Sequence, residues 1–188
     1  REIPGLTSSL GTNRTAVDIT GGHSHTCVIL DNGSVSCWGR NSSGELGDGG
    51  WYRDWEREIP GLTSSLGTNR TAVAISAGYQ HTCTILDDGS LSCWGENDQG
   101  QLGDGSTTPR PTPTQTASLG TDRTAIAITT GDRHTCAILD DESVSCWGKN
   151  GDGQLGDGST YFYRTSPTIE EEKIQWFVWI IVIIFFMF

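Results

Sequence analysis

The feature that most constrains this chain is an internal repeat. Residues 1–17 recur without change at 57–73, and a weaker copy covers 117–126. A longer segment, running from His-Thr-Cys to Gly-Asp-Gly, begins at His25, at His81 and at His134, so the offsets are 56 and then 53 residues. Three copies of a unit this long predict a propeller, a solenoid or a similar array, in which each unit buries its faces against its neighbours.

Each copy predicts β-strands. Residues 16–19 alternate apolar and polar side chains, as a half-buried strand does. Residues 26–30 and 34–38 flank Asp31-Asn32-Gly33, which suits a three-residue hairpin with Gly33 in the left-handed region. The third copy has Glu142 in the place of Gly33, which predicts a slightly strained turn. Because the first 165 residues show no helical period, the predicted fold class is all-β.

Glycine recurs at fixed places in every copy. The chain has 25 Gly in 188 residues. The positions after the tryptophan and in the following loop are Gly39, Gly95 and Gly148, then Gly44, Gly100 and Gly153, then Gly47, Gly103 and Gly156. We expect positive φ angles or close approach of neighbouring blades there. A phosphate loop is not indicated, since no helix pattern or loop lysine follows.

The repeated string resembles a known family. His-Thr-Cys-x-Ile-Leu-Asp-x-Gly-Ser-x-Ser-Cys-Trp-Gly-x-Asn-x-x-Gly-x-Leu-Gly-Asp-Gly is similar to the repeat of the regulator of chromosome condensation family, and it occurs three times in register over residues 1–165. The resemblance implies a seven-bladed β-propeller with four strands per blade. We therefore expect a partial propeller of about three blades, with repeats at about 1–56, 57–112 and 113–165. Further blades would come from missing sequence or from self-association.

The six cysteines form three pairs with constant spacing, Cys27/Cys37, Cys83/Cys93 and Cys136/Cys146. With the hairpin proposed above, the two members of a pair lie opposite each other on neighbouring strands, within disulfide range. Buried free thiols and a zinc site are the alternatives, although the short Cys-x-x-Cys spacing typical of zinc is missing. Disulfides would imply an exported protein. The Asn-x-Ser/Thr sequons at Asn13, Asn32, Asn41 and Asn69 are compatible with export.

The charge excludes one class of partner. Acidic residues outnumber basic ones 23 to 12, and the net charge is −11. A nucleic-acid-binding protein is expected to carry a basic stripe, and this sequence has none. We therefore expect no nucleic-acid partner.

The C-terminal composition changes abruptly. Residues 166–173 read as a linker, and residues 174–188 form an apolar segment in which Trp176 to Phe188 carries no charge. The two tryptophans at its start, behind a run of Glu and Lys, resemble an interfacial belt. We expect a helical membrane anchor, cut short at the end of the sequence. A strand of a further blade and a misread coding sequence are the alternatives.

The polar residues that recur in every copy favour structural roles. His25, His81 and His134 occupy one repeat position, and a catalytic residue is needed only once, so we expect a structural role for each, such as a bond to backbone near the hairpin. Asp48, Asp104 and Asp157 should anchor turns through backbone bonds. No nucleophile set can be assembled without these structural residues. The sequence predicts no enzyme activity, no catalytic residue, no metal and no cofactor.

The most distinctive single segment is the loop Trp51-Tyr52-Arg53-Asp54-Trp55, which is longer than its counterparts. Aromatic and arginine side chains dominate binding hot spots, so Trp51, Tyr52, Arg53 and Trp55 are the predicted partner-binding residues. Packing of the two tryptophans on the blade edge is the alternative.

These observations predict a non-enzymatic protein–protein interaction module, exported or on the cell surface, that binds a protein partner through inter-blade loops and is held at the membrane by Trp176–Phe188. The resemblance implies a second function, guanine-nucleotide exchange on a small GTPase, which would require an intracellular location. An adhesin or a surface structural component is a third interpretation.

Overall fold

The computed structural model describes residues 13–167, with the backbone alone for 52–60. It contains three four-stranded antiparallel sheets, one for each repeat. The first blade comprises β1 (Ala16–Gly21), β2 (His25–Leu30), β3 (Val35–Asn41) and β4 (Tyr52–Leu62). The second comprises β5 (Ala72–Ala77), β6 (His81–Leu86), β7 (Leu91–Gly95) and β8 (Arg110–Gln115). The third comprises β9 (Ala125–Thr130), β10 (His134–Leu139), β11 (Val144–Lys149) and β12 (Tyr163–Arg164).

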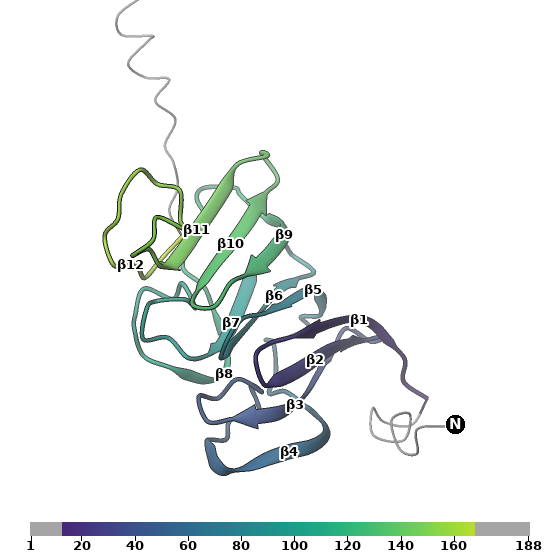
Figure 1. Cartoon of the computed structure of the whole chain (residues 1–188). Coiled ribbons are helices and arrows are strands. Elements are labelled where there is room, and N and C mark those ends of the chain that lie inside the picture. The colour runs from purple at the N-terminus through teal and green to yellow at the C-terminus, as the bar shows by residue number, and fades with distance from the viewer. Residues whose placement is uncertain (1–12, 168–188) are drawn as a thin grey trace, which may run out of the picture.

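The three sheets are arranged as successive blades of a fan (Figure 1). Each sheet has its strands in sequence order, with β1, β5 and β9 along one edge. These first strands lie next to one another, β1 beside β5 and β5 beside β9, so they form the inner edge of the fan. The predicted all-β class is confirmed, because residues 13–167 contain strands and turns and no helix. The number of blades in a complete ring stays a prediction.

Blades and sequence units are offset from each other. The unit boundary near residue 57 falls inside β4, and the boundary near residue 113 falls inside β8. The outer strand of one blade therefore runs into the unit that supplies the next blade. Neighbouring blades are joined through this strand and the loop after it.

The predicted three-residue hairpins are present between the second and third strands of each blade. Ile29 pairs with Val35 and Ile85 with Leu91 around these turns. Gly33 and Gly89 have φ angles of 74° and 76°, and Glu142 has a φ of 68°. A non-glycine side chain in the left-handed region is strained, so the prediction for Glu142 is confirmed.

The hydrophobic core lies between the blades as well as within them. One buried cluster joins Ile29, Val35 and Leu46 of the first blade to Ile75 and Trp94 of the second. The next joins Ile85 and Leu91 of the second blade to Ala137, Leu139 and Trp147 of the third. Each blade is completed by its neighbour, as expected of a repeat array.

The cysteine pairs form disulfides. The bonds join Cys27 to Cys37, Cys83 to Cys93 and Cys136 to Cys146, across directly paired strand positions with Cα atoms 4.2, 4.1 and 4.1 Å apart. No described cysteine is free. The predicted pairing is confirmed, and both the free-thiol and the zinc alternatives are excluded.

The predicted C-terminal anchor lies outside the described residues, as does most of the linker at 166–173. Within the described part of the chain, no helix has the length and hydropathy needed to cross a membrane. The assignment of Trp176–Phe188 to a membrane therefore stays a prediction from the sequence.

Candidate functional site

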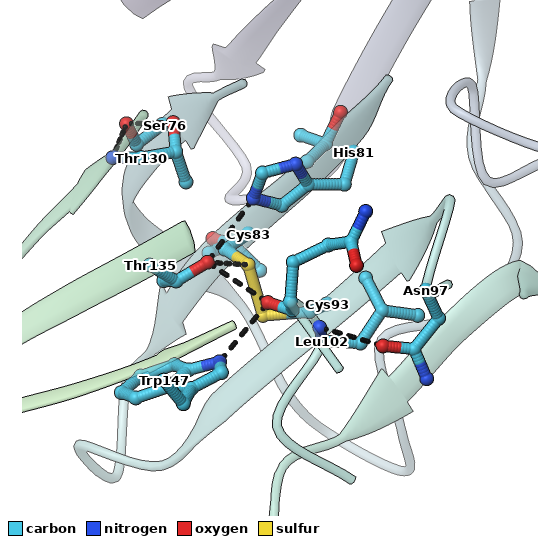
Figure 2. The surroundings of a disulfide bond; sticks show 12 residues. Ser76, His81, Cys83, Cys93, Asn97, Leu102, Thr130, Thr135 and Trp147 are labelled. Atoms are coloured by element: carbon cyan, nitrogen blue, oxygen red, sulfur yellow. Dashed lines mark hydrogen bonds between the residues drawn. A yellow bond between two sulfur atoms is a disulfide. The ribbon is translucent and has the colours of Figure 1, made fainter. Parts of the chain in front are cut away.

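We call the contact between two neighbouring blades the seam. A buried relay of hydrogen bonds joins the blades there. Between the second and third blades, His81 Nε2 lies 3.1 Å from the Thr135 hydroxyl, and that hydroxyl donates to the Gln101 carbonyl oxygen at 2.9 Å. The indole Nε1 of Trp147 donates to the same carbonyl at 3.0 Å (Figure 2). The carbonyl thus accepts two hydrogen bonds, which fills both of its lone pairs.

The seam between the first and second blades repeats this relay. His25 Nε2 lies 2.8 Å from the Thr82 hydroxyl, which donates to the Glu45 carbonyl at 3.1 Å, and Trp94 Nε1 donates to that carbonyl at 2.9 Å. The expectation that the repeated histidines are structural holds, but the predicted partner was wrong. The ring bonds to a threonine hydroxyl of the next blade, not to nearby backbone.

The relay fixes the protonation of the histidines. Because the threonine proton goes to the carbonyl, the histidine Nε2 must donate, so the neutral ring carries its hydrogen there. The Nδ1 atoms of His25 and His81 are buried without a hydrogen-bond partner. Burial lowers the pKa of His25 to about 4 and that of His81 to about 3. Both rings are therefore neutral at physiological pH and serve packing rather than acid–base chemistry.

Glycine allows the tryptophan to enter the seam. A Cβ at Gly47 would lie 2.8 Å from the Trp94 indole nitrogen, and one at Gly103 would lie 2.6 Å from that of Trp147. Both glycines also have a φ of 70°. The predicted close approach between blades is confirmed at these positions.

The Gly-rich loop, which joins the third and fourth strands of each blade, is held by one buried asparagine. In the second blade, the Asn97 amide donates to Asp104, and its oxygen accepts from the Leu102 backbone nitrogen. Asp104 in turn accepts from the Ser106 nitrogen, as Asp157 does from Ser159. The prediction that these aspartates anchor turns to backbone is confirmed. Hydrogen bonds lower the pKa of Asp157 to about 2, and the bond from the Ser159 hydroxyl has the largest influence.

The repeats differ mainly at one end of the blades. The register of β2 with β3 and of β3 with β4 places the turn at 22–24 and the loop at 42–51 at the same end. We call this end of the three blades the variable end. Its turns read His23-Ser24, Tyr79-Gln80 and Asp132-Arg133, whereas the hairpins at the opposite end all keep Asp at their first position and Ser after the turn.

Near the inner strands the variable end forms a shallow hollow. Its volume is about 250 Å³, and it is lined by the turns that contain His23, Tyr79 and Asp132. The rings of His23 and Tyr79 stack with centroids 4.3 Å apart. Outside this hollow, Arg133 contacts Asp98 at 2.8 Å and Glu96 at 3.7 Å across the seam. One scaffold therefore presents an imidazole, a phenol and a carboxylate at equivalent positions.

The predicted partner-binding segment also lies at the variable end. Trp51 is exposed over 49% of its surface, immediately before β4. Tyr52, Arg53 and Trp55 lie on β4 among the residues described by backbone alone, so their binding role stays a prediction.

Sequence reasoning missed a second aromatic loop at this end. Tyr161 and Phe162, in the third blade's counterpart of the Trp51 loop, are 71% and 81% exposed. The Arg164 guanidinium lies 5.6 Å from the centre of the Tyr161 ring, which is a cation–π contact. The signal was available in the sequence, because the third repeat has Thr160-Tyr161-Phe162-Tyr163 where the second has Thr107-Thr108-Pro109.

The described residues contain no group of three or more His, Cys, Asp or Glu side chains placed to hold a metal ion. The arrangement at the variable end offers exposed rings, a charged rim and a shallow hollow. These features suit contact with another macromolecule, since exposed apolar patches mark interaction sites.

Known proteins share this architecture. Among solved structures, yeast Prp20p superposes with a TM-score of 0.73 at 20% sequence identity, over 85% of this chain and 39% of that one. Human WBSCR16 superposes with a TM-score of 0.73 at 21% identity, over 82% of this chain and 39% of that one. At these identities the likeness establishes the fold.

Relatives by sequence are more similar. The ultraviolet-B receptor UVR8 of Arabidopsis thaliana is 31% identical over 172 residues, which is 91% of this chain and 37% of the receptor. The human E3 ubiquitin-protein ligase HERC2 is 34% identical over 159 residues, which is 84% of this chain and 3% of the ligase. The chain thus spans well under half of the curated relatives it matches.

Two family models of the regulator of chromosome condensation (RCC1) repeat match the chain. One matches residues 32–85 and 88–138, and the other matches 16–45, 72–101 and 125–154. The second set begins at the inner strand of each blade and ends in its Gly-rich loop. The matches of the second model therefore follow the three blades one by one, and the chain belongs to the RCC1 repeat family.

Proposed function

We propose that the chain is a non-enzymatic binding module that takes a protein partner at the variable end of its blades. The observation that supports this most is the distribution of differences among near-identical repeats. The residues of the seam recur in each blade, whereas the side chains at the variable end differ in size, aromaticity and charge. A scaffold that is constant inside and variable at one end is the general arrangement of repeat binding proteins.

The exposed aromatic residues give this end its binding capacity. Trp51, Tyr161 and Phe162 are solvent-accessible on the outer loops, and aromatic side chains are enriched in binding hot spots. Their backbone is supported by the buried asparagine bonds described above, so the loops present their rings at a low entropic cost. Tyr52, Arg53 and Trp55 would extend the same surface.

An exported location fits the covalent structure. Three disulfides within 188 residues are typical of oxidising compartments and rare in the cytosol. We therefore propose an extracytoplasmic module, with residues 174–188 as its membrane anchor. Thiol counting on protein isolated from its own cells tests the compartment: zero reactive thiols in denaturant without reductant supports export, and six would exclude it.

The binding proposal is tested with two matched variants. Tyr161→Ala with Phe162→Ala removes exposed aromatic surface at the variable end, and Leu62→Ala removes exposed apolar surface at the end of β4, on the opposite side. The bait is the disulfide-bonded chain, cross-linked to proteins of the same extracytoplasmic extract. We expect the captured partner to be lost with the double variant and kept with Leu62→Ala.

The opposite pattern would overturn the assignment of the binding end. A nucleotide-release assay with a small GTPase separates the alternative of guanine-nucleotide exchange, for which no described residue provides specific support. Release at the uncatalysed rate is the result expected for a binding module outside the cytosol.

A further inference from the structure

We propose that two copies of this chain associate head to tail, with the third blade of one copy forming a seam against the first blade of the other. The reason lies in what the two outer blades leave open. The third blade has the residues that one side of a seam requires, and the first blade has the residues that the other side requires. Since the two internal seams show both sides in contact, the chain itself provides the template for the association.

The open side of the third blade retains the seam residues of blades one and two. His134 occupies the position of His25 and His81, and Gln154 that of Glu45 and Gln101. Val144 is 57% exposed, whereas its counterpart Val35 is 1% exposed. Among the described residues, a Cβ at Gly156 would meet no atom within 4 Å, although both equivalent glycines contact a tryptophan of the next blade. No described residue therefore fills the place of a further indole.

The first blade carries the matching groups. Thr26 and Trp38 are only partly buried, whereas the equivalent Thr82 and Trp94 are 0% exposed. Ile19 is 66% exposed, and its counterpart Ile75 is 8% exposed within the first seam. In a head-to-tail pair, Thr26 would accept from His134 of the other copy, and Trp38 would donate to the Gln154 carbonyl.

Glu142 opposes a close fit between the third blade of one copy and the first blade of the other. Substituting it therefore provides a further test of the association. Gly33 and Gly89 lie so near the next blade that a Cβ would come within 2.3 Å of Thr71 and 2.4 Å of Thr124. The third blade has Glu142 at this position, and it would meet Thr15 of the second copy. Glu142 therefore weakens the association, and Glu142→Gly should strengthen it.

The contact is heterologous, so the pair keeps one open side of each kind: the first blade of one copy and the third blade of the other. Such contacts close into rings when the rotation permits and otherwise extend as open chains. Because each copy has a net charge of −11, copies repel each other at low salt. The seam groups themselves are neutral, so added salt should favour the association.

The decisive experiment is disulfide trapping between two different variants. In the second seam the hydroxyls of Ser76 and Thr130 lie 2.8 Å apart. The equivalent pair between copies is Thr129 and Gly21, and a Cβ at Gly21 would meet no atom of the described residues within 4 Å. We expect a mixture of Thr129→Cys and Gly21→Cys chains to give a cross-linked dimer upon mild oxidation, and either variant alone to give several-fold less.

Two further measurements complete the test. Light scattering after gel filtration of the unmodified 188-residue chain should show a mass that rises with concentration, more steeply for Glu142→Gly and less for Trp38→Ala. Circular dichroism confirms that each variant is folded. A constant monomer mass for both the unmodified chain and Glu142→Gly, or equal cross-linking in the single-variant samples, would overturn the proposal. Loss of partner binding at the variable end would leave it untouched.

Discussion

The two seams share one hydrogen-bond relay but differ in the charges beside it. In the first, Arg40 lies 3.8 Å from the buried carboxylate of Glu45. In the second, Glu96 takes the position of Arg40 and Gln101 that of Glu45, and the Gln101 amide donates to Glu96 at 3.4 Å. The relay uses the backbone carbonyl of residue 45 or 101, so it does not depend on which side chain that residue carries. The neighbouring pair can therefore change, provided that its two members remain complementary.

The largest effect should come from the shared indole. Trp94→Ala and Trp147→Ala each remove a fully buried side chain and leave a carbonyl with one fewer donor, so we expect a loss of about 3–5 kcal/mol in the free energy of unfolding. Urea denaturation measures both. Trp38→Ala, on the partly buried equivalent, is the control and should cost clearly less. Equal losses at all three positions would contradict the distinction between a seam and an open side.

Acid should weaken both seams. The folded pKa values of His25 and His81, about 4 and about 3, lie below the unfolded value near 6.5, so the unfolded chain binds more protons as the pH falls. Stability is complete above about pH 6.5 and should fall by roughly 2 kcal/mol for each histidine by about pH 4.5.

Burial raises the pKa of one carboxyl beside each seam, Glu45 at the first and Glu96 at the second, and these groups offset part of the loss at both seams. Urea midpoints across this pH range for His25→Gln and His81→Gln compare the two seams. A fall that persists unchanged in both variants would exclude the histidines as its cause.

Glu45 and Gln101 are equivalent residues that differ between the two seams. Exchanging them should change the free energy of unfolding by a smaller amount, with opposite signs at the two seams. Gln101→Glu brings a carboxylate to a buried position near Glu96 and Asp98, and should cost about 2 kcal/mol at neutral pH. Glu45→Gln removes a buried carboxylate whose Oε1 accepts no hydrogen bond and whose ion pair with the partly exposed Arg40 is long, at 3.8 Å, so it should stabilise by about 0.5 kcal/mol. Thermal unfolding measures both changes. Destabilisation of similar size by both would show that the flanking pair does not determine the difference.

A further small effect concerns the hairpin of the third blade, which has no neighbour among the described residues. Glu142→Gly relieves a positive φ and should stabilise by about 1 kcal/mol. Gly89→Ala at the equivalent hairpin introduces a Cβ 2.4 Å from Thr124 and should destabilise. Chemical denaturation at a concentration where the chain is monomeric separates this effect from association. A stabilising Gly89→Ala would refute the close approach at the seam.

Local features were predictable from the sequence, and contacts between blades were not. The hairpin of Asp31-Asn32-Gly33 fixes the register, so the Cys27–Cys37 bond followed from residue spacing. The bond between His25 and Thr82 joins residues 57 positions apart, and no local rule brings them together. The sequence held only an indirect signal for this bond. The separation of 57 is one more than the repeat offset of 56, because Thr82 directly follows His81, the counterpart of His25.

The variable end was found only in part. Trp51 stood out because its loop is the longest of the three, whereas the loop of Tyr161 and Phe162 is only one residue longer than that of the second repeat. The loop that carries them is held by Asn150, which donates to Asp157 and accepts from the Leu155 nitrogen. That support acts in three dimensions, so composition alone did not reveal it.

The position of the disulfides has a consequence for how the chain responds to proteolysis. Each bond joins the two central strands of one blade, and none of the three joins two blades. A single cut in the loop at 63–71 or at 116–124 would therefore leave pieces with no covalent link between them. Each piece would keep its own cross-linked hairpins, and only the seam would hold the pieces together.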